Sequence, residues 1–84
     1  MFSLRFQRPL VITRRAAERM RVRNVTEELL LKIVDTGYLR YSDSTRLWAW
    51  LEVPGRDDNL LCLAVVLEDA VVVKKVMHHW EVIE

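Results

Sequence analysis

The pattern of apolar and polar residues changes its period partway along the chain. In residues 14–36, apolar side chains recur at three- and four-residue spacing, which is typical of helices with one buried face. Beyond Gly37, a residue that favours the end of a helix, the pattern becomes that of strands, with apolar side chains at every second position in residues 46–53. We therefore predict helices in the first half of the chain and a sheet in the second.

Both predicted helices begin after a residue suited to cap them. Thr13 precedes residues 14–23 and Thr26 precedes residues 27–36, and a threonine hydroxyl can accept a hydrogen bond from a first-turn backbone N–H. Asn24 tolerates the left-handed conformation that ends many helices. These signals predict two short helices joined by a tight connection.

The strand-like half of the chain divides at polar turns. The predicted strands are residues 38–41, 46–53, 60–67 and 71–77, separated in part by turns at 54–59 and 68–70. Residues 60–67 are apolar on both faces, as expected of a central strand. We predict a single α+β domain over residues 1–84, with two N-terminal helices packed on one face of a three- to four-stranded antiparallel sheet.

Composition excludes several classes of protein. The longest nearly unbroken apolar run has eight residues, whereas a membrane-spanning helix needs about 20. The N-terminal stretch has arginines scattered among its apolar residues, unlike a secretion signal, so we expect a cytoplasmic protein without a membrane association.

Cys62 lies within an apolar strand and is expected to be a buried structural thiol. No metal-ligand spacing or glycine-rich phosphate loop is present, so no cofactor is expected.

The charge is unevenly distributed although the net charge is only +1. Residues 1–24 hold seven arginines and one acid, whereas residues 25–84 hold six basic and eleven acidic residues. On the first predicted helix, Arg15, Arg19 and Arg23 form a stripe beside the apolar face. This stripe either grips the phosphates of a nucleic acid or is a solvated face that pairs with the acidic part of the chain.

Three further groups of residues are candidates for function. His78 and His79 end the last predicted strand and are candidates for proton transfer, or are ordinary edge-of-strand residues. Trp48 and Trp50 share one face of a strand, where they either stack on bases or pack under the helices as core. The candidate residues for nucleic-acid binding are therefore Arg15, Arg19, Arg23, Trp48, Trp50, Lys74 and Lys75.

The helical segment resembles a family of small bacterial domains that is grouped with RelE, ParE and BrnT-like toxins. Its motif reads His-Ala-x-x-Arg-Met-x-x-Arg-Gly-Ile-Ser/Thr, and the resemblance covers residues 11–77. The matching positions are Arg19, Met20, Arg23 and Thr26, with Val25 for Ile and Asn24 for Gly. Arg15 replaces the leading His, and a guanidinium cannot act as a base near neutral pH. The resemblance implies a RelE/barnase-like fold but leaves the reaction open.

Two functions follow from these observations as hypotheses. The first is a toxin-like RNA-interacting domain, with arginines holding phosphate and with His78 or His79 as the proton-transfer group of a metal-independent endoribonuclease. For a toxin, the expected protein partner is a small acidic antitoxin-like protein. The second is a non-catalytic module in which Trp48, Trp50 and the arginines form a surface for a protein partner or a second copy of the chain, and the replacement of His by Arg15 favours it.

Overall fold

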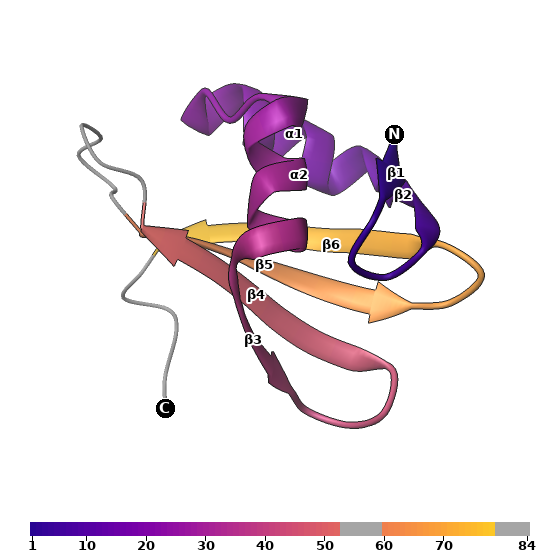
Figure 1. The fold of residues 1–84 in the computed structure, drawn as a ribbon. Helices are drawn as coiled ribbons and strands as arrows, with labels where there is room; N and C mark the ends of the chain where they lie inside the picture. The colour runs from indigo at the N-terminus through magenta and orange to yellow at the C-terminus, as the bar shows by residue number, and fades with distance from the viewer. Residues whose placement is uncertain (53–59, 79–84) are drawn as a thin grey trace.

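The computed structural model describes residues 1–52 and 60–78, and it is an α+β fold. Its elements are β1 (Phe2–Ser3), β2 (Arg8–Ile12), α1 (Arg14–Arg23), α2 (Glu27–Thr36), β3 (Tyr38–Tyr41), β4 (Arg46–Glu52), β5 (Leu60–Leu67) and β6 (Val71–His78). Both helices lie on one side of the sheet (Figure 1). No helix within the described ranges is long and apolar enough to cross a membrane.

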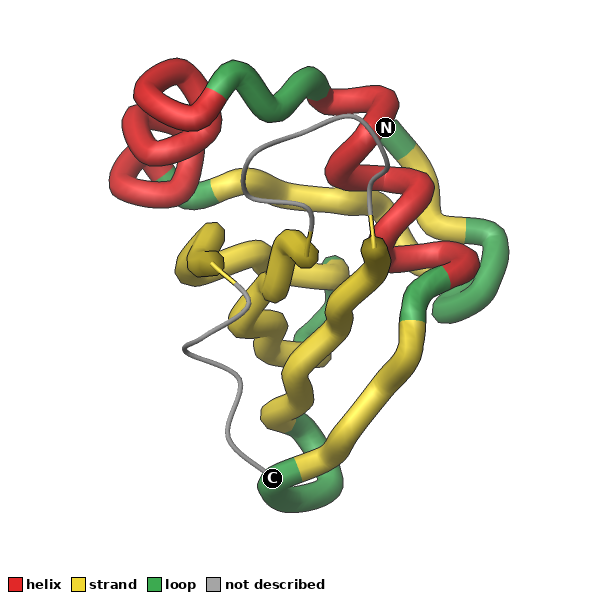
Figure 2. Tube along the Cα trace, turned by 90° about the vertical axis from the view of Figure 1, so that its left-hand side faces the viewer, coloured by secondary structure: helices red, strands yellow, loops and turns green. Residues whose placement is uncertain are grey.

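The strands form one mixed sheet of six strands in the order β1-β2-β6-β5-β4-β3. Strand β2 runs parallel to β6, pairing Leu10 with Val71 and Ile12 with Val73, while every other neighbouring pair is antiparallel. Figure 2 shows how the strands twist beneath the two helices. Strand β5 is central, as its two apolar faces predicted.

The predicted RelE/barnase-like sheet of three to four antiparallel strands is therefore wrong. Two strands precede the helices, and one of them joins the last strand of the chain in parallel. Strand β1 has only two residues, and β2 contains Arg8 and Pro9, so neither shows the alternation by which a strand is recognised. Their pairing also depends on contacts between distant parts of the chain, which local periodicity does not encode.

The helix limits agree with those predicted, and the caps explain why. The Thr13 hydroxyl accepts a hydrogen bond from the Ala16 N–H at 3.2 Å, and the Thr26 hydroxyl accepts one from the Leu29 N–H at 3.1 Å. Asn24 ends α1 in the left-handed conformation, with φ at 55°. Of the predicted strand 46–53, the structure describes residues 46–52 as β4. Val53 and the predicted turn at 54–59 lie outside the described residues.

One hydrophobic core lies between the helices and the sheet. Helix α1 packs mainly against β6, whereas α2 packs against β4 and β5. The core side chains with no exposed surface are Ala16, Leu30, Ile33, Val34, Ala49, Leu61, Leu63, Val71 and Val73. Because both helices and the long strands contribute to the same cluster, the core holds α1 in a fixed position over β6.

The β1–β2 hairpin is fastened to the end of α2 by polar contacts. The buried Ser3 hydroxyl donates to Asp35 Oδ1 at 2.6 Å, and the Leu4 N–H donates to Asp35 Oδ2 at 3.2 Å. Arg5 donates to the carbonyls of Val34 and Gly37, which lie at the end of the helix. One of the N-terminal arginines therefore has a structural role.

Candidate nucleic-acid interface

A hollow of about 390 Å³ lies between α1 and the C-terminal half of β6. It is lined by Arg15, Arg19, Lys75, Val76 and Met77, and we call it the basic hollow. All three cationic residues are exposed, whereas Val76 is buried and Met77 is half-buried. The site thus combines an apolar floor with three positive side chains.

The basic hollow exists because β2 is shorter than β6. Strand β2 pairs with β6 only along Val71–Val73. The next residue, Thr13, donates its N–H to the Val73 carbonyl at 3.2 Å, and α1 begins directly after it. Helix α1 therefore packs against the rest of β6, where β2 no longer pairs with it. Arg15 and Arg19 are four residues apart on this helix, so their side chains lie one above the other.

A β-bulge in β6 adds to the positive charge at this edge. The pairing of β5 with β6 shifts between Ala64 and Val65, so that Ala64 pairs with Lys75 while Val65 pairs with Val73. Lys74 is the extra residue, and both lysines are exposed between two buried valines. The bulge thus places two successive lysines in solvent.

No carboxylate among the described residues forms a salt bridge with Arg15 or Arg19. Between described residues, the structure shows an ion pair of Arg46 with Asp43, in the turn between β3 and β4. The idea that the stripe pairs with the acidic part of the chain is thus unsupported for these two arginines. Arg23 differs from them because it is half-buried and does not line the basic hollow.

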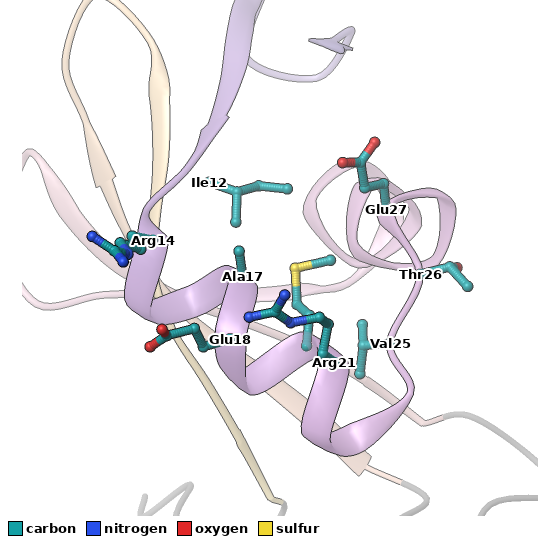
Figure 3. A pocket seen from close by; sticks show the side chains of 9 residues that line it. Ile12, Arg14, Ala17, Glu18, Arg21, Val25, Thr26 and Glu27 are labelled. Carbon is teal, nitrogen blue, oxygen red and sulfur yellow. The ribbon is translucent and has the colours of Figure 1, made fainter.

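The other side of α1 has a different character. Arg14 and Arg21 line a second, open hollow with Glu18 and with Glu27, the first residue of α2 (Figure 3). Two basic and two acidic side chains balance in this second hollow, so it offers no net charge to an anion. The unbalanced positive charge of α1 lies on the side of the basic hollow.

The two tryptophans of β4 lie on the sheet face turned away from the helices, which we call the open face. Leu47 and Ala49 belong to the core, and side chains alternate along a strand, so Trp48 and Trp50 point to the other face. Both are half-buried. The Tyr38 ring stacks on the Trp50 ring at a centroid distance of 5.9 Å.

Strand register orders the open face into two rows that cross the sheet from β6 to β3. The first row is Lys75, Ala64, Trp48 and Arg40, and the second is Met77, Cys62, Trp50 and Tyr38. The first row begins at the basic hollow. Cys62 is buried, as the sequence predicted.

The catalytic role predicted for His78 and His79 stays a prediction. The backbone of His78 pairs with Leu61 at the end of β6, and its side chain and the whole of His79 lie outside the described part of the chain. The described residues contain no cluster of His, Cys, Asp and Glu that could hold a metal ion.

Tyr38 and Arg40 are members of the open face that sequence reasoning missed. Alternation within residues 38–41 puts these two side chains on one face of a strand. Which face it is follows only from the pairing of Tyr38 with Trp50 and of Arg40 with Trp48.

A scan against protein-family models and searches of curated proteins and of solved structures found no significant match to this chain.

Proposed function

We propose that the protein is an RNA-interacting domain that holds the phosphate backbone in the basic hollow. The observation that carries this proposal is the convergence of Arg15, Arg19 and Lys75 on one hollow, with no acidic partner for the two arginines among the described residues. The toxin-like part of the proposal rests on the sequence motif at Arg19, Met20, Arg23 and Thr26 alone.

The chemistry of the three side chains supports a phosphate ligand. A guanidinium stays charged and presents a fork of N–H donors that fits two phosphate oxygens. Arg15 and Arg19 are one helical turn apart, about 6 Å between their Cβ atoms, so they can contact the backbone at separate points. Lys75 adds a compact charge from the sheet side. Such contacts release counterions and make binding dependent on salt.

A narrower proposal adds cleavage of the bound RNA without a metal. In this reaction the 2′-oxygen attacks the adjacent phosphorus, a 2′,3′-cyclic phosphate forms, and the 5′-oxygen leaves. One group takes the 2′-hydroxyl proton and another gives a proton to the 5′-oxygen. His78 and His79 are the candidates because they directly follow Met77, which lines the basic hollow. Cleavage of labelled RNA in buffer with chelator, lost in His78→Ala or His79→Ala, is the expected result.

A second candidate function is a non-catalytic module that pairs with another copy of the chain. It is favoured by the aromatic open face and by β3, an edge strand whose Tyr38 and Tyr41 are 65% and 50% exposed. Under this alternative the protein forms a dimer at micromolar concentration, which sedimentation detects, and replacement of Arg15 and Arg19 leaves its binding unchanged.

The salt dependence of RNA binding tests the main proposal. The apparent association constant of the wild type for a generic RNA should fall steeply as salt rises, because phosphate contacts release counterions. The double variant Arg15→Gln/Arg19→Gln should flatten the slope of log K against log salt by about one to two units. Fluorescence anisotropy over a salt series provides the measurement.

A control with the same change of charge comes from the other side of the same helix. Arg14→Gln/Arg21→Gln also removes two exposed arginines from α1, but these line the second hollow with its two glutamates. It should leave the slope close to that of the wild type. Equal flattening in both double variants would mean that only net charge matters, and absence of salt-dependent binding in the wild type would refute the proposal.

A further inference from the structure

We propose that the open face binds an unpaired segment of the RNA strand, which runs across the sheet from β6 to β3 with its bases stacked on the tryptophans. This inference rests on the proposed function, because the strand enters from the basic hollow. It adds the conformation of the ligand, its path over the protein, and two binding residues, Tyr38 and Arg40.

The path follows from the first row of the open face. Lys75 belongs to the basic hollow, Trp48 lies two strands away, and Arg40 lies on the edge strand β3. Neighbouring strands are about 4.8 Å apart, so the span from Lys75 to Arg40 is about 14 Å. A strand stacked at about 3.4 Å per nucleotide would place about four nucleotides over this length, and bases that lie flat on aromatic rings take more room, so four is the upper limit. The first row therefore places a cation near each end of a short RNA strand and an aromatic ring between the two cations.

The surface between these cations suits bases and not a double helix. Ala64 fills the position between Lys75 and Trp48 in the first row, so a base can approach the sheet closely there. In the second row Tyr38 stacks on Trp50 and is 65% exposed, which extends the aromatic surface toward the edge of the sheet. Aromatic side chains stack on bases whose faces are accessible, whereas a duplex keeps those faces inside.

Charge favours RNA over a second copy of the chain as the occupant of this face. The row has positive residues at both ends, with Lys74 and Lys75 on β6 and Arg40 on β3, all exposed. In a symmetric face-to-face dimer, each of these ends would meet a positive end of the partner, and like charges in contact oppose association. Among the described residues of β4, Glu52 is the acid on this face, at the end of the strand beyond Trp50.

The test compares an unpaired and a paired probe. A fluorescein-labelled oligo(U) of about 12 nucleotides, within the range that single-strand-binding folds cover, is titrated with the protein alongside an RNA duplex of the same length. The wild type should bind the single strand about 10-fold more tightly or better. Trp48→Leu should weaken single-strand binding about 10-fold, the loss expected for one stacked base, and should leave duplex binding unchanged.

Arg40→Gln keeps the test valid if Trp48→Leu fails to fold, because Arg40 is exposed. It should weaken single-strand binding several-fold and lower its salt slope by about 0.7. Arg21→Gln, the matched control, removes one exposed arginine from the second hollow and should change neither value. Circular dichroism establishes that each variant is folded.

Three outcomes would overturn the inference. The wild type could bind both probes with equal affinity, while Arg15→Gln/Arg19→Gln still reduces the salt dependence of binding. This result would reject the stacking surface and leave the proposed function standing. A dimer that dissociates in Trp48→Leu would assign the open face to a second copy of the chain. No binding of either probe by the wild type would reject both proposals.

Discussion

The glycine that follows α2 is required because there is no space for a side chain. The φ of Gly37 is −73°, a value open to any residue, and its N–H donates to the Ile33 carbonyl at 2.9 Å. A Cβ at this position would lie 2.5 Å from the Ile33 oxygen and 2.6 Å from the Trp50 oxygen. The sequence predicted the helix end, but the close approach of β4 could not be foreseen.

Gly37→Ala should therefore destabilise the protein. Both contacts are with backbone atoms, so the end of α2 or strand β4 must move, at a cost of about 1–3 kcal/mol in the free energy of unfolding. Urea denaturation of the variant and the wild type measures the difference. An unchanged midpoint and slope would show that α2 and β4 do not approach each other as described.

Asp43 organises the turn between β3 and β4 through its carboxylate. Asp43 Oδ1 accepts hydrogen bonds from the N–H groups of Thr45 and Arg46, both at 2.8 Å, and from the Thr45 hydroxyl at 3.1 Å. The bond from the Thr45 N–H, followed by that from Arg46, lowers the pKa of Asp43 below its usual value of 3.8. These bonds favour the charged form of the group.

We predict that Asp43 titrates below the ordinary range in the folded protein. A lowered folded-state pKa stabilises the fold at pH values above the unfolded-state pKa, and this contribution is lost as the pH falls through the folded-state pKa. Asp43 is exposed, so the effect on stability is expected to be small. NMR titration of the side-chain carboxyl carbon gives the midpoint, and a midpoint at or above 3.8 would contradict the hydrogen bonding described.

At the scale of whole elements, local sequence predicted the helices and the longer strands but not the N-terminal hairpin. Thr13, Thr26 and Asn24 fix the helix limits through contacts within a few residues, so these limits can be read from the chain. The hairpin depends on Ser3 and Arg5 reaching Asp35 and the carbonyls at the end of α2, about thirty positions away. Contacts of that range leave no periodic signal.

Helix α2 contributes three buried side chains, Leu30, Ile33 and Val34, to the core. Leu30 and Ile33 are completely buried, so Leu30→Ala should lower the free energy of unfolding by about 2–5 kcal/mol, through lost apolar contact and the cavity that remains. Leu4→Ala makes the same chemical change at a position that is 70% exposed and should cost far less. Similar losses for both variants in urea denaturation would place the core elsewhere.

The molecule as a whole shows how a chain of nearly neutral net charge acquires a positive site. Some N-terminal arginines have other roles: Arg5 binds carbonyls at the end of α2, and Arg14 and Arg21 share a hollow with two glutamates. Arg15 and Arg19 remain without an acidic partner among the described residues, and the fold brings Lys75 to them. The basic hollow is therefore positive because Arg15 and Arg19 have no carboxylate beside them among the described residues, while other arginines do.

The candidate site could be predicted only in part from the sequence. Helical spacing identifies Arg15 and Arg19 as neighbours, and strand alternation identifies Trp48 and Trp50 as sharing a face. The meeting of Arg15 with Lys75 requires the parallel pairing of β2 with β6, which puts α1 beside the end of β6. The inclusion of Arg40 requires the β3–β4 register.

The most direct test of the central claim is an NMR titration of the labelled protein with a short single-stranded RNA. We predict that amide shifts change at Arg15 and Arg19, along β6 from Lys74 to Met77, and next at Trp48 and Arg40. The amides of the β1–β2 hairpin and of α2 should remain in place. Shift changes confined to the hairpin or to the second hollow, or no changes at any RNA concentration, would contradict it.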